Sequence, residues 1–267
     1  MAVPVLYHGE PNGPSLSVLA ALYESGLDIE CRPIDLRAGE RHTLPGVTES
    51  VALDMAVEGE GPVLVAPNDS GGAEAMAEAV FLAQYFDEKA GGCGLQPSDA
   101  YARWQMLMWC RQATERLSPA VAYLGNLAWS QKRLAKMSQE EFERLLATIV
   151  SVDLRQRWQE LRDDVVDAAK VEDSKTKVAQ FAARVETQLA DGREWLMGPF
   201  SIADLETYAW LRSMRELEAD AFAGQRCCLA WMDRVEARPS VRKALARATT
   251  DNPAHAFAPG PEINRWG

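Results

Sequence analysis

The amino-acid sequence predicts an α+β protein, in which a small mixed β-sheet with its helices precedes an all-helical domain. Two observations support this class. Residues 1–90 contain short apolar runs of strand length separated by helical periodicity, in the order β-α-β and then β-β-α. Residues 98–267 instead repeat their apolar residues at three- and four-residue spacing almost throughout. The glycines and the proline between these regions predict a domain boundary at 90–98.

The first domain opens with a βαβ unit. Val3–Tyr7 is a short apolar run typical of a strand, and Leu27–Ile34 alternates well enough for a second strand. Between them, Ser15 begins an amphipathic helix, and Gly26 stands where helices commonly end. A connection of this length predicts a parallel pair of strands with a right-handed crossover.

The rest of this domain is less regular. Leu36–Gly61 is rich in charge and predicts a loop with one weak helix near Val51–Val57. Pro62–Ala66 and Ala73–Met76 predict two further short strands, since a proline is permitted at the first residue of a strand. The apolar positions that follow Glu78 predict the last helix of this domain.

Two capping boxes mark helix starts in the second domain. In such a box, a Ser or Thr side chain and an acidic side chain three residues later each bind a backbone N–H that the helix start leaves free. Ser138 with Glu141 and Ser201 with Asp204 have this spacing. Asn252–Gly267 has three prolines and predicts a surface tail. Further helices are predicted at Asp99–Leu124, Lys175–Leu189, Cys228–Val235 and, with Ser240 as its cap, Val241–Ala248.

Charge and composition argue against several classes of function. Lys and Arg number 28 and Asp and Glu 39, which gives a formal net charge of −11. Phosphate backbones and anionic lipids repel an acidic chain, so neither nucleic-acid nor membrane binding is expected. No apolar run approaches the length of a membrane span, and the N-terminus does not resemble a signal peptide. We therefore expect a cytoplasmic protein.

The cysteines and histidines give no sign of a metal site. The five cysteines are scattered without CxxC spacing and are expected to be reduced structural thiols. The three histidines lie far apart in the sequence, so no metal ligation is predicted, although convergence in space stays open.

Separated motifs together resemble the glutathione transferase family. The resemblance covers most of the chain, and it implies a thioredoxin-like glutathione-binding domain at 1–90 and an all-helical C-terminal domain at 98–267. It also implies an insert at about 125–175 that is longer than usual for the family. The motifs are the loop and helix Gly13–Leu27, the segment Gly59-Glu-Gly-Pro62-Val-Leu64, Glu78 ahead of its helix, and Trp195–Asp204 of the form W-L-x-G-P-x-S-I-A-D, with Trp231–Val241 in support.

Within this family, the first helix is similar to that of the serine-type bacterial β-aryl etherases of lignin breakdown. The match is close at Leu19-Ala-x-Leu-Tyr-Glu-x-Gly-Leu27. This resemblance implies glutathione as co-substrate and Ser15 as the catalytic residue that donates a hydrogen bond to its thiolate. Such a bond and a nearby helix N-terminus both lower the pKa of a thiol. The alternative for Ser15 is an ordinary N-cap that needs no substrate.

The resemblance also implies how the rest of glutathione is bound. Pro62 would be a cis proline, so that the backbone before it pairs with the cysteinyl part of glutathione; the alternative is a trans proline that starts a strand. Glu78 would bind the γ-glutamyl ammonium, or mark the turn whose N–H groups bind its carboxylate; the alternative is an acidic residue that complements the helix dipole. The implied glutathione-binding set is Ser15, Gly61, Pro62, Val63, Glu78 and Ala79.

Three departures from the family pattern weaken this implied site. Pro14 stands where the etherases carry Asn, Gly61 stands where Val is usual, and Ala79 replaces a Ser whose hydroxyl would bind the γ-glutamyl carboxylate. Losing one charge-assisted hydrogen bond costs about 1.5–3 kcal/mol, which is about one to two orders of magnitude in affinity.

The first helix of the second domain carries candidates for the acceptor-substrate pocket. In the family this helix borders that pocket, and aromatic walls suit aromatic substrates. The candidates are Trp104, Met108 and Trp109, and the alternative is that they are core or dimer contacts.

Three functions are compatible with these features. The first is a glutathione transferase of the β-etherase type, in which the thiolate attacks an aromatic ether or another electrophilic aromatic compound. The second is a non-catalytic structural subunit of a heterodimeric transferase, with a degraded glutathione site. The third is a protein that binds hydrophobic ligands without chemistry. Whether the dimer partner is a second copy or a related chain stays open.

Overall fold

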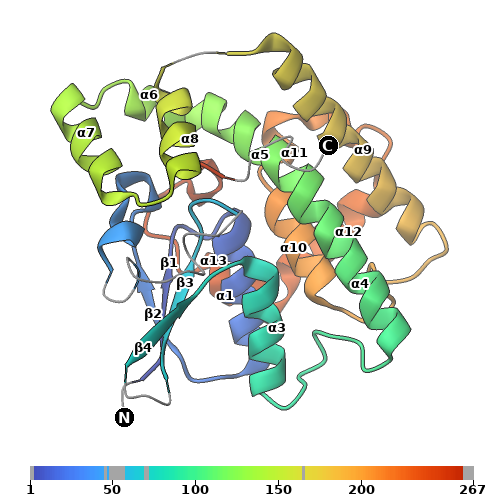
Figure 1. Cartoon of the computed structure of the whole chain (residues 1–267). Coiled ribbons are helices and arrows are strands. Elements are labelled where there is room, and N and C mark those ends of the chain that lie inside the picture. The colour runs from blue at the N-terminus through green and yellow to red at the C-terminus, as the bar shows by residue number, and fades with distance from the viewer. Residues whose placement is uncertain (1–2, 45–46, 48–57, 69–71, 164–165, 261–267) are drawn as a thin grey trace.

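The computed structural model of the chain describes residues 3–44, 47, 58–68, 72–163 and 166–260. Figure 1 shows a small sheet with α1 and α3 beside it, and a larger helical region packed against that pair. The predicted α+β class is therefore confirmed. The weak helix expected near Val51–Val57 lies outside the described residues.

Four strands form one mixed sheet in the order β2-β1-β3-β4. β1 runs parallel to β2 and antiparallel to β3, and β3 runs antiparallel to β4, so the predicted βαβ unit is confirmed. Leu6 on β1 pairs with Leu64 on β3, and both side chains are fully buried. The elements are β1 (Val5–His8), α1 (Gly13–Ser25), β2 (Glu30–Pro33), the 3-10 turns η1 (Leu36–Ala38) and η2 (Glu40–Thr43), β3 (Val63–Pro67), β4 (Ala73–Met76) and α3 (Ala79–Lys89).

Helices make up the rest of the described chain. The predicted segment 99–124 is helical but is broken by a π-helical turn, η3. No helix in the described ranges is both long and apolar enough to cross a membrane. The elements are α4 (Ala100–Gln112), η3 (Ala113–Leu117), α5 (Ser118–Gly125), η4 (Asn126–Ser130), α6 (Gln131–Leu134), α7 (Gln139–Thr148), α8 (Val152–Arg162), α9 (Ala168–Leu189), α10 (Ile202–Leu211), α11 (Met214–Leu217), η5 (Ala219–Phe222), α12 (Arg226–Ala237), α13 (Pro239–Leu245) and η6 (Pro253–His255).

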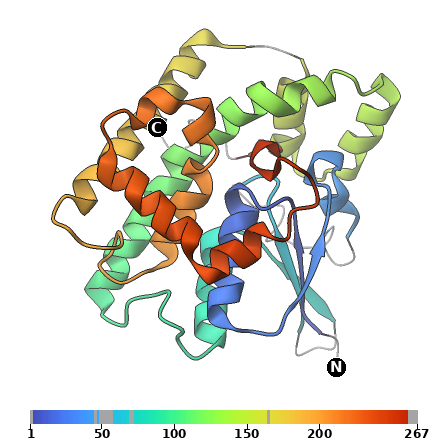
Figure 2. The same cartoon turned by 180° about the vertical axis from the view of Figure 1, so that it is seen from behind.

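Helix α1 joins the sheet domain to the helical domain. It packs against α3 on one side and against α10 and α13 on the other, and Figure 2 shows α13 beside it from behind. Leu16, Leu19 and Leu22 are fully buried in this shared core. Because each buried leucine contributes about 1.5–3 kcal/mol, the core holds the N-terminus of α1 firmly in place.

Both predicted capping boxes are present, at Ser138 and at Ser201. The second is buried, and the Asp204 carboxylate accepts hydrogen bonds from Ser201 N–H at 3.0 Å, Leu196 N–H at 3.0 Å and Trp231 Nε1–H at 2.8 Å. Burial raises the pKa of Asp204 to about 6, against the opposing effect of these donors. The box therefore ties α10 to both the preceding loop and α12.

Helices α6–α8 lie within the segment 125–175 that the sequence led us to expect as an insert, and in Figure 1 α7 and α8 lie above the sheet domain. They have a small apolar core of their own, and Trp158 Nε1–H also donates to the Glu60 carboxylate at 2.8 Å. This contact joins the insert to the sheet domain. The core consists of Leu134, Phe142, Leu145, Ile149, Leu154 and Trp158.

Residues 252–260, here called the C-terminal strap, are not the surface tail that was expected. The strap passes between the domains, and the Phe257 side chain is buried. Its backbone carbonyls accept hydrogen bonds from Asn12 Nδ2 at Ala256, from Ser130 Oγ at Phe257 and from Asn126 Nδ2 at Ala258. The prediction was wrong because prolines remove only N–H donors, whereas this segment is held by its carbonyl groups.

Two helices begin earlier than the sequence suggested. α1 begins at Gly13 with Asn12 as N-cap, so Ser15 is its third residue, and α13 begins at Pro239 with Arg238 as N-cap. In both helices a proline stands within the first two positions, where its fixed φ suits the helix and its missing N–H costs nothing. The Ser240 hydroxyl donates to the Glu24 carboxylate at 2.5 Å instead of capping α13.

Candidate active site

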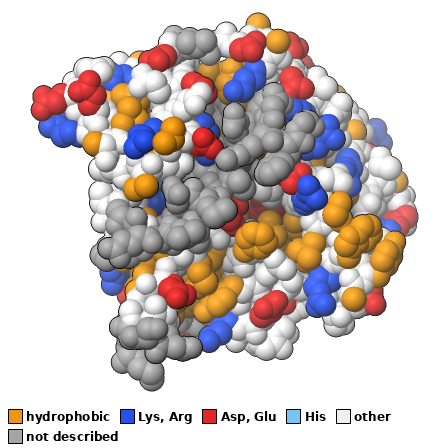
Figure 3. Space-filling model, viewed as in Figure 1, with side chains coloured by type: hydrophobic (Ala, Val, Ile, Leu, Met, Phe, Trp, Pro, Cys, Tyr) orange, Lys and Arg blue, Asp and Glu red, His pale blue; other side chains and the backbone are white. Residues whose placement is uncertain are grey.

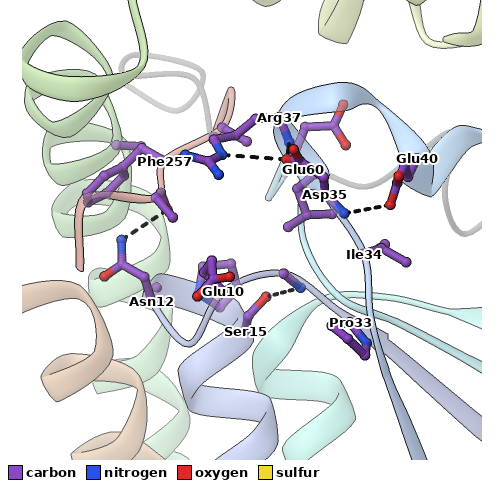
Figure 4. A pocket seen from close by; sticks show the side chains of 18 of the residues that line it. Glu10, Asn12, Ser15, Pro33, Ile34, Asp35, Arg37, Glu40, Glu60 and Phe257 are labelled. Carbon is purple, nitrogen blue, oxygen red and sulfur yellow. Dashed lines mark hydrogen bonds and ion pairs between the residues drawn. The ribbon is translucent and has the colours of Figure 1, made fainter. Parts of the chain in front are cut away.

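A cavity of about 320 Å³ lies at the N-terminus of α1, beside the C-terminal strap. Its walls come from the loop after β1, from residues 33–37, from Glu58 and Glu60 ahead of β3, and from the strap. Figure 4 shows Ser15 at its base, with Asn12 and Phe257 on one side and Pro33 on the other. The segment ahead of β3 and the C-terminal strap are far apart in the sequence, yet both contribute to this cavity at the N-terminus of α1.

Ser15 is the predicted catalytic residue, and it lines this cavity. Its side chain is only 1% exposed, and its Oγ accepts a hydrogen bond from Gly9 N–H at 3.0 Å. A Cβ at Gly9 would lie 2.6 Å from Leu36 Cδ1, so a larger residue here would require the Leu36 side chain to shift. Because Oγ is fixed as an acceptor, its own proton is free to be donated to a ligand.

The side chain of Asn12 does not cap α1, although Asn12 occupies the N-cap position. Its Nδ2 donates to Ala256 O of the strap at 3.2 Å. The backbone N–H groups of the first turn are therefore not satisfied by this cap, and they add partial positive charge near Ser15. Ser15 is not an N-cap, so that alternative reading of Ser15 was wrong.

Glu78 and Ala79 lie at the start of α3, as predicted, with Glu78 as N-cap. Glu78 has φ of 72°, the positive value that non-glycine residues rarely adopt. Ala79 N–H donates to Glu58 Oε2 at 2.9 Å, and Glu58 N–H donates to Glu78 Oε1 at 3.2 Å. Neither Glu78 nor Ala79 is among the residues that line the cavity, whereas Glu58 is.

Gly61, Pro62 and Val63 also lie behind the cavity wall rather than on it. Val63 pairs with Tyr7 of β1 inside the sheet and is fully buried. No cis peptide bond occurs in the described ranges, so the bond before Pro62 is trans and the predicted cis proline was wrong. The trans form of an X–Pro bond is the lower in energy by about 0.5–1 kcal/mol. Glu58 lies close to this loop, since a Cβ added at Gly61 would be 3.3 Å from Glu58 Oε2.

Glu60 connects the parts of the protein around the cavity. Its buried Oε1 lies 2.7 Å from His42 Nε2 and accepts from Trp158 Nε1–H at 2.8 Å, while its N–H donates to Pro259 O at 2.8 Å. Burial alone would raise the pKa of Glu60, but the hydrogen bond and charge of His42, with the charge of Arg41, lower it overall. Glu60 is thus an ionised, buried junction of η2, α8 and the strap.

The cavity is strongly acidic. Among its described lining residues Arg37 is the one basic side chain, and it lies 3.5 Å from the Asp35 carboxylate. Asp35 also pairs with Arg133 at 2.8 Å. An anionic ligand therefore meets an unfavourable field over most of the cavity. The acidic lining residues are Glu10, Asp35, Glu40, Glu58 and Glu60.

The predicted acceptor-pocket residues are not brought to this cavity. Trp109 is buried, and its Nε1–H donates to Thr207 Oγ1 at 2.9 Å in the helical core. Trp104 is 54% exposed and stacks on Tyr101 at the surface. Met108 is partly buried on the same helix, and none of these three candidates lines this cavity or the one that adjoins it.

A second cavity, of about 370 Å³, adjoins the first and was not foreseen from the sequence. Ala122 of α5 and Gly260 of the strap line both cavities. The second is bounded by α5, α8 and α9, with Tyr123 and Leu127 on its wall. No motif in the sequence pointed to this cavity, because its walls come from helices and a strap that are far apart in the sequence.

Comparison with known proteins supports a relationship along almost the whole chain. Residues 132–239 match the family model for the glutathione S-transferase C-terminal domain. The curated protein LigF of Sphingobium sp. is 25% identical, over 92% of this chain and 95% of its own length.

Solved structures show the same fold. The crystal structure of the β-etherase LigF from Sphingobium sp. matches with a TM-score of 0.76 and 23% identity, covering 92% of this chain and all of that one. A glutathione transferase family member from Pseudomonas fluorescens, solved with two glutathione molecules, matches with a TM-score of 0.64 and 18% identity over 91% of this chain and 92% of its own. These similarities confirm the resemblance to the glutathione S-transferase superfamily, including a β-etherase, that the sequence motifs indicate.

Proposed function

We propose that this chain is a glutathione transferase of the β-etherase type in which Ser15 activates the thiol. The observation that carries the proposal is the Ser15 hydroxyl, held by Gly9 N–H at the first turn of α1 and lining a cavity of about 320 Å³. The relationship to LigF, which extends over 92% of the chain, supports the same class.

Ser15 would act on the acidity of the bound thiol. Its hydroxyl donates a hydrogen bond to the thiolate sulfur, and the free N–H groups at the start of α1 add a favourable field. A charge-assisted hydrogen bond contributes about 1.5–3 kcal/mol, which corresponds to a fall of about one to two units in the thiol pKa. More of the glutathione is then present as the nucleophilic thiolate at neutral pH.

The substrate we propose is an aromatic β-aryl ether. The thiolate attacks the β-carbon, a C–S bond forms, the C–O bond breaks, and the electron pair leaves on the aryloxide, which takes a proton from water. Trp210, Leu36 and Phe257 give the cavity aromatic and apolar wall area against which an aryl group can pack. The adjoining cavity at Tyr123 offers further room for the second ring.

Replacing Ser15 tests this proposal. Ser15→Ala is expected to lower kcat/KM for glutathione-dependent ether cleavage by about 10- to 100-fold, the loss that one charge-assisted hydrogen bond implies. Ser25→Ala at the other end of α1, where Oγ donates to Leu22 O, is the matched control. Equal activity of the two variants would exclude Ser15 as the thiol partner.

A second candidate is a structural subunit of a heterodimeric transferase, and one surface favours it. Phe81, Tyr101 and Trp104 are 65%, 65% and 54% exposed, and Figure 3 shows apolar side chains gathered over α3 and α4. Exposed large apolar side chains gathered on one face are typical of a protein–protein interface. Native mass of the purified chain, alone and with a related transferase chain, distinguishes a homodimer from a heterodimer. Absence of glutathione binding by the isolated chain would favour the structural role.

A further inference from the structure

The N-terminus of α3 already holds a carboxylate that belongs to the chain itself. Ala79 N–H, the first free donor of this 11-residue helix, binds Glu58 Oε2 at 2.9 Å. The position is the one at which the N–H groups of this turn would bind the γ-glutamyl carboxylate of glutathione. The side chain of Glu58 comes from 21 residues away and is only 3% exposed.

Glu58 also separates Ala79 from the cavity. Glu58 lines the same cavity as Ser15, whereas Ala79 does not. A ligand that enters beside Ser15 therefore meets the Glu58 carboxylate before it can reach the N–H of Ala79. With Ala at position 79, no hydroxyl group is available to give an entering carboxylate a second donor.

Two further acidic side chains influence Glu58. Burial, and next the charges of Glu78 and Glu206, raise the pKa of Glu58 well above its ordinary value. Glu206 on α10 is fully buried, and its Oε2 has no hydrogen-bond partner among the described residues. The direction of this shift shows that the buried surroundings of Glu58 disfavour a negative charge, so they also disfavour a ligand carboxylate at the same place.

We propose that Glu58 is a specificity-determining residue of this cavity, because its carboxylate replaces that of a ligand at Ala79. The site then favours a thiol whose far end carries no carboxylate. This inference rests on the proposed function, in which Ser15 binds the thiol of a γ-glutamyl peptide.

Two peptides test the inference by calorimetry on the full chain. One is glutathione, and the other is γ-aminobutyryl-cysteinylglycine, which lacks only the γ-glutamyl carboxylate. The wild-type chain is expected to bind the second peptide at least as tightly as glutathione. In Glu58→Ala, glutathione affinity is expected to rise at least about tenfold, while affinity for the second peptide changes less than about threefold.

Two more variants separate the effect of Glu58 from general charge and from folding. Glu58→Gln keeps an oxygen that can accept from Ala79 N–H, so a smaller gain for glutathione is expected than in Glu58→Ala. Glu40→Gln removes one charge from the rim of the same cavity without contact to Ala79, and less than about a threefold gain is expected. Melting temperatures of all variants establish that each is folded.

Two results would overturn the inference while leaving the proposed function in place. One is a wild-type preference for glutathione over the second peptide by more than about tenfold. The other is an unchanged glutathione affinity in both Glu58 variants, with Ser15→Ala still lowering turnover. If no variant binds either peptide, both the inference and the proposed function fail.

Discussion

Replacing Glu60 by Ala tests the central junction of the structure. The change removes a buried carboxylate that accepts from Trp158 Nε1–H and lies 2.7 Å from His42 Nε2, with Arg41 at 3.9 Å. Each buried donor left without an acceptor costs about 1–3 kcal/mol, and breaking a buried charge pair from one side costs about 3–5 kcal/mol. Because these contributions overlap, we expect a loss of about 3–5 kcal/mol in the free energy of unfolding.

Urea denaturation at neutral pH measures this loss. Glu140→Ala is the matched control, because Glu140 pairs with Arg144 on an exposed helix face, where such pairs contribute about 0.3–0.5 kcal/mol. The folded-state pKa of Glu60 lies below that of the unfolded chain, so its stabilisation is present above the unfolded pKa and is lost as pH falls through the folded value. The difference between wild type and Glu60→Ala should therefore shrink in acid. A loss below about 1 kcal/mol at neutral pH would refute the reasoning.

Three further predictions concern the core, the strap and the exposed apolar patch. Asp204→Ala removes the acceptor of four buried donors and should lower the free energy of unfolding by at least about 3 kcal/mol; a urea midpoint equal to wild type would contradict this. Gly125→Ala places a Cβ 2.5 Å from the Phe257 ring, so the strap should be displaced and should be cleaved faster in limited proteolysis. This is expected even though alanine by itself favours the helical conformation of α5 over glycine. Unchanged cleavage would argue against a tightly packed strap. Combined Phe81→Ser and Trp104→Ser changes should reduce the native mass to that of a monomer if α3 and α4 form the dimer interface; an unaltered dimer mass would place the interface elsewhere.

Local signals predicted much of the fold. The capping boxes at Ser138 and Ser201 and the strand Ala73–Met76 depend on residues within a few positions of each other, so periodicity and spacing predict them. The start of α1 was misplaced because the Asn12 side chain binds the strap, 244 residues away, instead of the helix. The π-helical turn within 99–124 likewise has no local signature in the sequence.

The candidate site was only partly predictable from the sequence, because several of its contacts also join residues that are far apart along the chain. Ser15 and Glu78 could be found from motifs, since each stands at the start of a helix. Glu58 and Glu60 could not, because their roles depend on partners from 18 to 98 residues away. The strap could not either, because its carbonyl groups carry the contacts and the side-chain pattern does not reveal them.

The pKa of the glutathione thiol bound to the chain tests the central claim most directly. It can be read from the ultraviolet absorbance of the thiolate as pH is raised, in wild type and in Ser15→Ala at saturating glutathione. We predict a thiol pKa about one to two units below that of free glutathione in wild type, and a return toward the free value in Ser15→Ala. An equal thiol pKa in the two proteins would contradict the role assigned to Ser15.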